Sequence, residues 1–212
     1  RTPVSVIRAN SETLIDSALE DKKQAKIFAK AILHNAERLT DMVSSLLDLS
    51  RIEYGELKLN FEEIDLNAFF ENFIESIINL SKKKDIDINY LPNHKGSVNA
   101  DFQAIERIMN NLIDNAIKYS EEGSEIKIST SNDGDDYIRV TVEDTGEGIS
   151  PEDQDHIFSR FFRTASARAT DNQGSGLGLA IVKHLVNNLN GEVGIESKPQ
   201  KGSIFWFTIP IF

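Results

Sequence analysis

Three glycines stand at the start of a predicted helix, where residues 173–182 read Q-G-S-G-L-G-L-A-I-V. Glycine costs about 1 kcal/mol relative to alanine inside a helix, so Gly174, Gly176 and Gly178 suggest a structural gain or a ligand. A phosphate fits, because unpaired N–H groups at a helix N-terminus attract anions and glycine allows a close approach. A turn that joins a strand to a helix explains the same pattern, so the other motifs must decide.

A second stretch, residues 110–120, places amides and a lysine on one face of a predicted helix. Asn111 and Asn115 are four residues apart, and Lys118 follows Asn115 by about one turn. Mg²⁺ takes oxygen ligands and keeps several waters, so an amide oxygen can help to hold it while the lysine meets a phosphate. A buried, hydrogen-bonded polar stripe explains this segment equally well.

A third stretch, V-E-D-T-G-E-G-I at 142–149, brings a carboxylate to the end of an apolar strand. Gly146 and Gly148 remove side-chain bulk from the turn that follows Asp144. A carboxylate at the bottom of an apolar pocket can accept a hydrogen bond from the exocyclic amine of adenine, and this would select adenine over guanine. A turn at the end of a strand needs no ligand to explain it.

The fourth stretch is I-F-S-R-F-F-R at 157–163, followed by T-A-S-A-R-A-T-D-N-Q at 164–173. Phe158, Phe161 and Phe162 are most simply interpreted as core residues. The small, polar segment behind them is more typical of a mobile lid over a ligand than of a packed loop.

The composition limits the classes of partner. At 212 residues and 40% hydrophobic content, the chain can form one large domain or two small ones. Its net charge of −11 argues against nucleic acid or an anionic membrane as the main partner. It has no cysteine, which fits a cytoplasmic domain, and we find neither a signal peptide nor an apolar stretch near 18 residues.

The sequence divides into two regions, a helical one at 1–53 and a later one in which helices and strands alternate and which carries the four motifs. Residues 1–53 have apolar residues at helical spacing and predict a helical hairpin, with a polar connection at 19–23. Two helices cannot enclose a core, so dimerisation into a four-helix bundle is the natural completion. The later region predicts a two-layer α/β sandwich with a mainly antiparallel sheet. Its predicted strands are 57–61, 86–90, 125–131, 137–144, 192–197 and 203–210, and its predicted helices are 67–83, 102–119, a short one after Ser150, and one from the glycines to Asn190.

Together, N-x-x-x-N-A-x-K-Y, D-x-G-x-G, F-x-R-F-x-R and G-x-G-L-G-L resemble, in this order and spacing, the catalytic ATP-binding domain of bacterial sensor histidine kinases. The likeness covers residues 57–212, and it implies the sandwich shared with gyrase, the Hsp90 chaperones and the mismatch-repair ATPases. The hairpin resembles the dimerisation and phosphoacceptor domain of the same family. The resemblance therefore implies an α+β fold with a hairpin at 1–53, a linker at 54–60 and an ATP-binding domain at 61–212.

The resemblance also implies roles for individual residues. It implies Asn115 on Mg²⁺, Asn111 and Lys118 near the phosphates as catalytic groups, and Asp144 on adenine. The other residues implied to contact the nucleotide are Tyr119, Gly146, Gly148, Ile149, Phe158, Arg163, Gly174, Ser175, Gly176, Leu177, Gly178 and Leu179.

The family's phosphoacceptor motif, H-E-x-x-T-P, is represented here only by R-T-P at residues 1–3. This alignment places the acceptor histidine just upstream of Arg1, and it matches Thr2 to a position associated with dephosphorylation of the partner. Hydrolysing relatives typically carry glutamate where this chain has Asn111, and asparagine cannot activate water as a base. By analogy, the phosphoryl group should pass to a side chain.

The resemblance implies Mg-ATP as cofactor, and as partners a second copy of the chain and the receiver domain of a response regulator. A membrane is expected only through segments upstream of this chain. Two alternatives stay open: a serine kinase of the anti-sigma-factor type, against which the long hairpin argues, and a nucleotide-binding scaffold without kinase activity, against which the glycines and Asn115 argue.

Overall fold

The computed structural model describes residues 2–18, 21–53, 58–170 and 174–212. The chain divides into two compact units, Arg1–Ser50 and Arg51–Phe212. The expected linker at 54–60 lies only partly within the described residues, since these begin again at Lys58.

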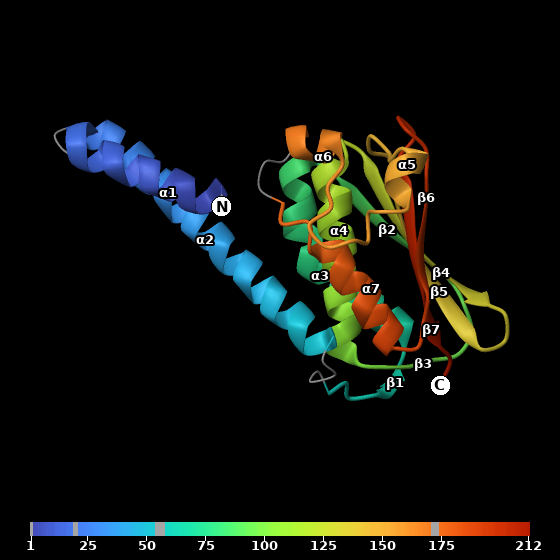
Figure 1. Cartoon of the computed structure of the whole chain (residues 1–212). Helices are drawn as coiled ribbons and strands as arrows, with labels where there is room; N and C mark the ends of the chain where they lie inside the picture. Colours follow the sequence, from blue (N-terminus) through green and yellow to red (C-terminus); the bar gives the residue numbers. More distant parts are fainter. Residues whose placement is uncertain (1, 19–20, 54–57, 171–173) are drawn as a thin grey trace. The chain divides into compact units, whose positions relative to one another are not determined.

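The first unit is the predicted helical hairpin. Helix α1 (Thr2–Thr13) continues into one π-helical turn, η1 (Leu14–Ala18), and α2 spans Lys22–Glu53 (Figure 1). Asp21 caps α2, because its Oδ1 accepts hydrogen bonds from the N–H groups of Lys23 (2.8 Å) and Gln24 (3.2 Å). With 32 residues at about 1.5 Å each, α2 is roughly 48 Å long.

The second unit contains a five-stranded mixed sheet with the order β2-β4-β5-β7-β6. The β2–β4 pair is parallel and the other pairs are antiparallel, so the sheet is mainly antiparallel, as the sequence predicted. A separate two-stranded ribbon joins β1 to β3. The strands are β1 (Glu62–Ile64), β2 (Asp87–Asn93), β3 (Val98–Ala100), β4 (Glu125–Asp133), β5 (Tyr137–Asp144), β6 (Val193–Ser197) and β7 (Ser203–Pro210).

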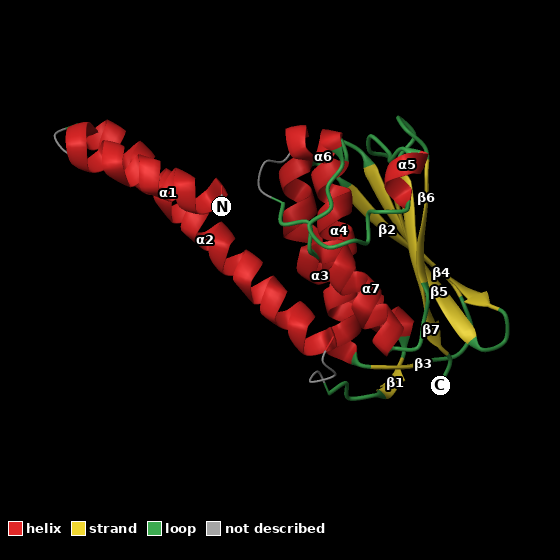
Figure 2. Ribbon diagram, viewed as in Figure 1, coloured by secondary structure: helices red, strands yellow, loops and turns green. Residues whose placement is uncertain are grey.

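Three helices cover one face of this sheet, which gives the expected two layers (Figure 2). They are α3 (Leu66–Ser81), α4 (Phe102–Tyr119) and α7 (Gly178–Asn188). Shorter helical segments are η2 (Lys82–Lys84), α5 (Pro151–Gln154) and α6 (Ala165–Thr170). The Asp101 and Ser150 side chains cap α4 and α5 by accepting from the N–H groups of Ala104 and Asp153.

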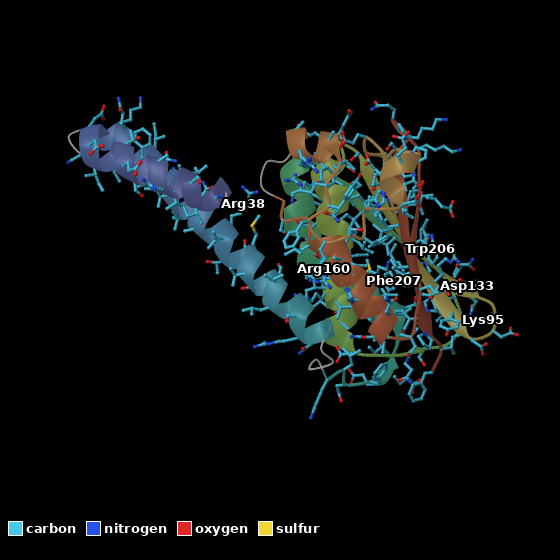
Figure 3. The ribbon with its side chains drawn as sticks, viewed as in Figure 1. Arg38, Lys95, Asp133, Arg160, Trp206 and Phe207 are labelled. Atoms are coloured by element: carbon cyan, nitrogen blue, oxygen red, sulfur yellow. The ribbon has the colours of Figure 1, made fainter. Side chains whose placement is uncertain are left out.

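The core lies between the helices and the sheet. Consecutive strand residues alternate between the two faces, so Phe207 is fully buried under the helices while Trp206 faces the other way (Figure 3). On that outer face, the Arg139 guanidinium stacks over the Trp206 ring at 4.2 Å and pairs with Asp133 at 2.8 Å. The helix-facing side is therefore the apolar side against which α4 and α7 are held.

The C-terminal end of α4 is fixed by a lysine. Lys84 Nζ donates hydrogen bonds to the carbonyl oxygens of Ile117 (2.9 Å), Lys118 (3.0 Å) and Ser120 (3.3 Å). A cation at this end donates hydrogen bonds to carbonyls that have no partner within the helix, and it is attracted by the partial negative charge at the helix C-terminus. The last turn of α4 is therefore held in place from outside the helix.

The predicted strand at 57–61 was wrong over its described part, 58–61, because β1 begins at Glu62. Asn60 instead donates its backbone N–H to the Asp101 carboxylate at 2.7 Å. The three-residue strand β3 was not predicted, since so short a segment shows no clear alternation. Asp65 caps α3, but α3 ends at Ser81, before the predicted end at residue 83, and passes into a 3₁₀ turn.

Replacing Phe207 by alanine should lower the free energy of unfolding by about 3–5 kcal/mol, because it leaves a cavity in the core. Urea denaturation checks this. Phe212→Ala is the matched control, since that side chain is 66% exposed and its loss should cost less than about 0.5 kcal/mol. Equal costs for the two variants would contradict the placement of the core.

Candidate functional site

One pocket gathers most of the predicted site residues. It lies between α4, the start of α7, and the ends of β5 and β7. The predicted residues that line it are Asn111, Asn115, Lys118, Tyr119, Asp144, Gly148, Ile149, Arg163, Gly174, Ser175, Gly176, Gly178 and Leu179. The fold thus brings together four stretches that lie far apart in the sequence.

One wall of the pocket is a face of α4. Asn111, Asn115 and Lys118 succeed one another along this face, as the spacing predicted. The Asn111 amide is oriented by its Nδ2, which donates to the carbonyl of Arg107 at 2.7 Å. Lys118 Nζ lies 3.8 Å from the carboxylate of Asp114, which also lines the pocket. This wall therefore offers amide oxygens and an ammonium group to a ligand.

Among the other residues that line the pocket, Asp144 is a buried carboxylate that is 6% exposed. Its Oδ1 accepts hydrogen bonds from the N–H groups of Gly146 (2.9 Å) and Ser203 (3.3 Å). Burial raises the pKa of Asp144, and these two hydrogen bonds partly oppose the rise. Since both bonds use Oδ1, the second carboxylate oxygen is available to a donor on a ligand.

The turn after Asp144 needs its glycines for steric reasons. A Cβ on Gly146 would lie 2.5 Å from the carbonyl oxygen of Tyr119. Gly148 has a φ of +68°, and a Cβ there would overlap the carbonyl of Lys198. Both glycines therefore permit close packing around the carboxylate, whether or not a ligand is present. Gly146 does not itself line the pocket.

The glycines at the start of α7 leave room for a side chain of α4 and for the backbone around Phe161. A Cβ on Gly178 would lie only 2.6 Å from Asn111 Oδ1. Gly176 has a φ of +71° and passes close to the backbone of Phe161. Leu177 is fully buried and does not line the pocket, unlike Gly178 and Leu179, which follow it. The first turn of α7 therefore faces the polar side of α4.

Arg163 connects the residues on either side of the predicted lid, 164–173. Its guanidinium donates to the carbonyl of Gly174 at 3.1 Å and to that of Ala167. The segment predicted as a mobile lid contains the short helix α6, and its residues 171–173 lie outside the described residues.

The interpretation of Phe161 as a core residue was wrong, since this side chain is 60% exposed. Its φ of +61° and the hydrogen bond from its N–H to the carbonyl of Gly176 (2.8 Å) turn it outward. Phe158 is half-buried and does not line the pocket, whereas Phe162 is half-buried and does.

Comparisons with known proteins agree with this architecture. Residues 1–55 match the His Kinase A (phospho-acceptor) domain, and residues 100–212 match the histidine kinase-, DNA gyrase B- and HSP90-like ATPase family. The chain is 37% identical over 210 residues to the sensor-like histidine kinase SenX3 of Mycobacterium tuberculosis. That match covers 99% of this chain and 51% of SenX3, so the chain spans about half the length of this relative.

The chain belongs to the sensor histidine kinases. Solved structures of the family superpose on it. The histidine kinase AdeS of Acinetobacter baumannii has a TM-score of 0.79 and 27% identity, with 100% of this chain and 96% of that chain covered. ThkA, solved in complex with the response regulator protein TrrA, has a TM-score of 0.75 and 26% identity, with 100% of this chain and 58% of that chain covered.

Sequence reasoning missed several residues that line this histidine kinase pocket. They are Asp114, Glu147, Ile157, Phe162, Ser203 and Phe205, whereas the lining residues Thr164 and Ala167 belong to the segment that the sequence predicted as a lid. Asp114 could have been found from its spacing, since it lies three residues after Asn111 on the same helix. Ser203 could not, because only the strand register pairs it with Asp144.

The predicted phosphatase residue Thr2 begins α1 in the other unit, and its side chain lies outside the described residues. Along the part of the chain that the structure describes, no helix is long and apolar enough to cross a membrane.

Gly148→Ala should destabilise the protein by about 2–5 kcal/mol, because it combines a left-handed backbone with overlap at the Lys198 carbonyl. Gly134→Ala is a matched control, since Gly134 has the same φ of +68° and a Cβ there would have nothing within 4 Å. It should cost only about 1–2 kcal/mol. Thermal unfolding measures both, and similar losses would contradict the close packing at Gly148.

Proposed function

We propose that this chain is the core of a sensor histidine kinase that binds Mg-ATP and phosphorylates a histidine. The observation that supports this best is one pocket that is lined by a buried carboxylate, by amides and an ammonium group, and by the glycines at the start of a helix. Such a pocket is matched to a ligand with a hydrogen-bonding base and a polyanionic tail.

Asp144 is proposed to select adenine. The carboxylate oxygen that is not used by Gly146 and Ser203 can accept from the exocyclic amine of the base. Guanine presents a carbonyl oxygen at the corresponding ring position, and two acceptors facing each other repel. Burial strengthens this discrimination, because an unmatched polar group in the pocket cannot be compensated by water.

The phosphates are proposed to lie between α4 and the first turn of α7. The glycines expose backbone N–H groups at the start of an 11-residue helix, where the dipole favours negative charge. Lys118 faces the same pocket and adds a point charge.

Mg²⁺ is proposed to be held by the phosphate oxygens, water and the amide oxygen of Asn115, a donor set that suits a hard cation. Bound there, it would neutralise charge on the phosphates during transfer.

The phosphoryl acceptor is proposed to be a histidine upstream of Arg1 in the longer protein. A ring nitrogen of the imidazole attacks the γ-phosphorus, a P–N bond forms, and the bond to the ADP oxygen breaks. Asn111 favours transfer to a side chain over hydrolysis, because an amide cannot take a proton from water as a carboxylate can. The phosphoramidate then passes its phosphoryl group to an aspartate of a response regulator. Thr2 is proposed to help when the regulator is dephosphorylated.

The hairpin is proposed to dimerise and to present the histidine. Apolar side chains that are 45–69% exposed lie mostly along α2, where they include Ile27, Leu33 and Leu46, and Ile15 of η1 is another. A second copy of the hairpin would bury them in a four-helix bundle. The structure of ThkA with TrrA supports a response regulator as the other partner.

Asp144→Asn should weaken Mg-ATP binding about 10- to 100-fold, the equivalent of a charge-assisted hydrogen bond of about 1.5–3 kcal/mol. The same change should stabilise the ligand-free protein at pH 7. A carboxyl whose pKa is raised by folding stabilises the fold only while protonated, and this contribution is lost as the pH rises through the raised pKa. Calorimetry measures the binding, and urea denaturation measures the stability.

Asp87→Asn is the control, because Asp87 is an exposed residue of β2 outside the pocket. It should change neither quantity appreciably. An Asp144→Asn protein that binds Mg-ATP as tightly as the original would remove Asp144 from the adenine role. One that binds weakly because it is partly unfolded would show a loss of stability instead of a gain.

A longer chain that includes the upstream histidine should incorporate label from γ-labelled ATP and Mg²⁺ in a form that is acid-labile and base-stable. Asn115→Asp tests the metal site in the same assay, with Asn93→Asp, at an exposed position of β2 outside the pocket, as its control. Label on serine would instead favour a serine kinase, and binding of ATP without any label would favour a scaffold.

A further inference from the structure

A chain of hydrogen bonds leads away from the adenine end of the pocket to two residues that do not line it. Gln154, the last residue of α5, donates both hydrogens of its side-chain amide, one to the carbonyl of Ile149 (2.9 Å) and one to that of Ser197 (3.0 Å). Ser197, the last residue of β6, accepts at Oγ from the N–H of Ile149 (2.8 Å). Both backbone polar groups of Ile149, a pocket residue, are therefore held by this pair.

The strand register continues the chain to the carboxylate. Ser197 is paired with Ser203, and Ser203 with Asp144, so the three side chains lie in one row across β6, β7 and β5. Ser197 Oγ donates to the carbonyl of Gly202 (2.9 Å) and lies 3.0 Å from Ser203 Oγ. Ser203 in turn donates its N–H to Asp144 Oδ1.

The β6–β7 turn packs directly on the other side of the same loop. The N–H of Gln200 donates to the carbonyl of Glu147 at 2.7 Å, and the carbonyl of Lys198 occupies the space where Gly148 lacks a Cβ. The loop at 146–149 is thus fixed by backbone contacts from the turn and by side-chain contacts from Gln154 and Ser197. Its position depends on groups outside the pocket.

We propose that Gln154 and Ser197 are positioning residues that set the selectivity of this site for adenine. They act through Ile149 and Ser203, which line the pocket, and they touch no nucleotide themselves. This inference rests on the proposed nucleotide function. Because the hydrogen bonds end at the base-binding loop and at Asp144, loosening them should widen the base end and leave the α4 and α7 wall unchanged.

The test is displacement of a fluorescent ATP analogue by Mg-ATP and by Mg-GTP. Ser197→Ala removes the acceptor of the Ile149 N–H, and Gln154→Leu removes both amide donors. Each should weaken ATP binding about 3- to 10-fold, the effect of one or two net hydrogen bonds, and should weaken GTP binding less. The preference for ATP over GTP should therefore shrink.

Ser197→Thr keeps the hydroxyl, so this variant should retain the preference for ATP over GTP. Ser129→Ala is the matched control for the serine, since Ser129 lies on the outer face of the sheet, paired with Thr141. Gln103→Leu, at an exposed position in the first turn of α4, is the control for the glutamine. Neither control should change the ratio of the two affinities.

Unchanged ATP affinity in both variants would overturn the inference. Equal losses for ATP and GTP would also overturn it, because general destabilisation weakens both nucleotides alike. If the unaltered protein bound neither nucleotide, the proposed function itself would fail, and this outcome is distinct from a variant that behaves like the parent.

Discussion

The structure of the pocket depends on one buried carboxylate, Asp144. Removing a carboxylate from water is costly, and here the compensation consists of two backbone N–H groups, from Gly146 and Ser203. The neighbouring Glu143 adds repulsion. The buried carboxylate lowers the folding stability of the ligand-free protein. A ligand that donates a hydrogen bond to the second carboxylate oxygen would offset this loss.

The strand register and the turn next to Asp144 supply the contacts that hold this carboxylate. The β5–β7 register supplies the Ser203 N–H, and the absence of a side chain at Gly146 lets the carbonyl of Tyr119 pass close to the turn. Tyr119 ends α4, whose terminal carbonyls are held by Lys84. The position of the turn after Asp144 is therefore connected through the backbone to α4, the helix that carries the two asparagines and Lys118.

The same packing explains why the glycine segment contains glycine. Gly178 lies against the amide oxygen of Asn111, and any side chain at Gly178 would displace that amide. The glycine at the start of α7 therefore also fixes where a polar group of α4 can lie. Close packing alone gives a reason for these glycines, and the space that they leave is where we propose that a phosphate binds. In this site, close packing and ligand binding make compatible demands on the sequence.

The sequence alone predicted the mainly antiparallel sheet, the hairpin and most of the residues that meet in the pocket. Periodicity and the Asp65 cap are local signals, and they were enough to predict α3 and α4. Features that depend on tertiary contacts were not predicted. The strand β3 is too short to show a pattern, Ser203 reaches the pocket only through register, and Phe161 is turned outward by a hydrogen bond to Gly176.

The most direct measurement is a crystal structure of this chain with Mg²⁺ and a non-hydrolysable ATP analogue. We expect the exocyclic amine of adenine at hydrogen-bonding distance, about 2.8–3.0 Å, from the Asp144 carboxylate. We also expect the phosphates between the first turn of α7 and the side chains of Asn115 and Lys118. A base bound away from Asp144, or phosphates away from α7, would contradict the proposed mode of nucleotide binding.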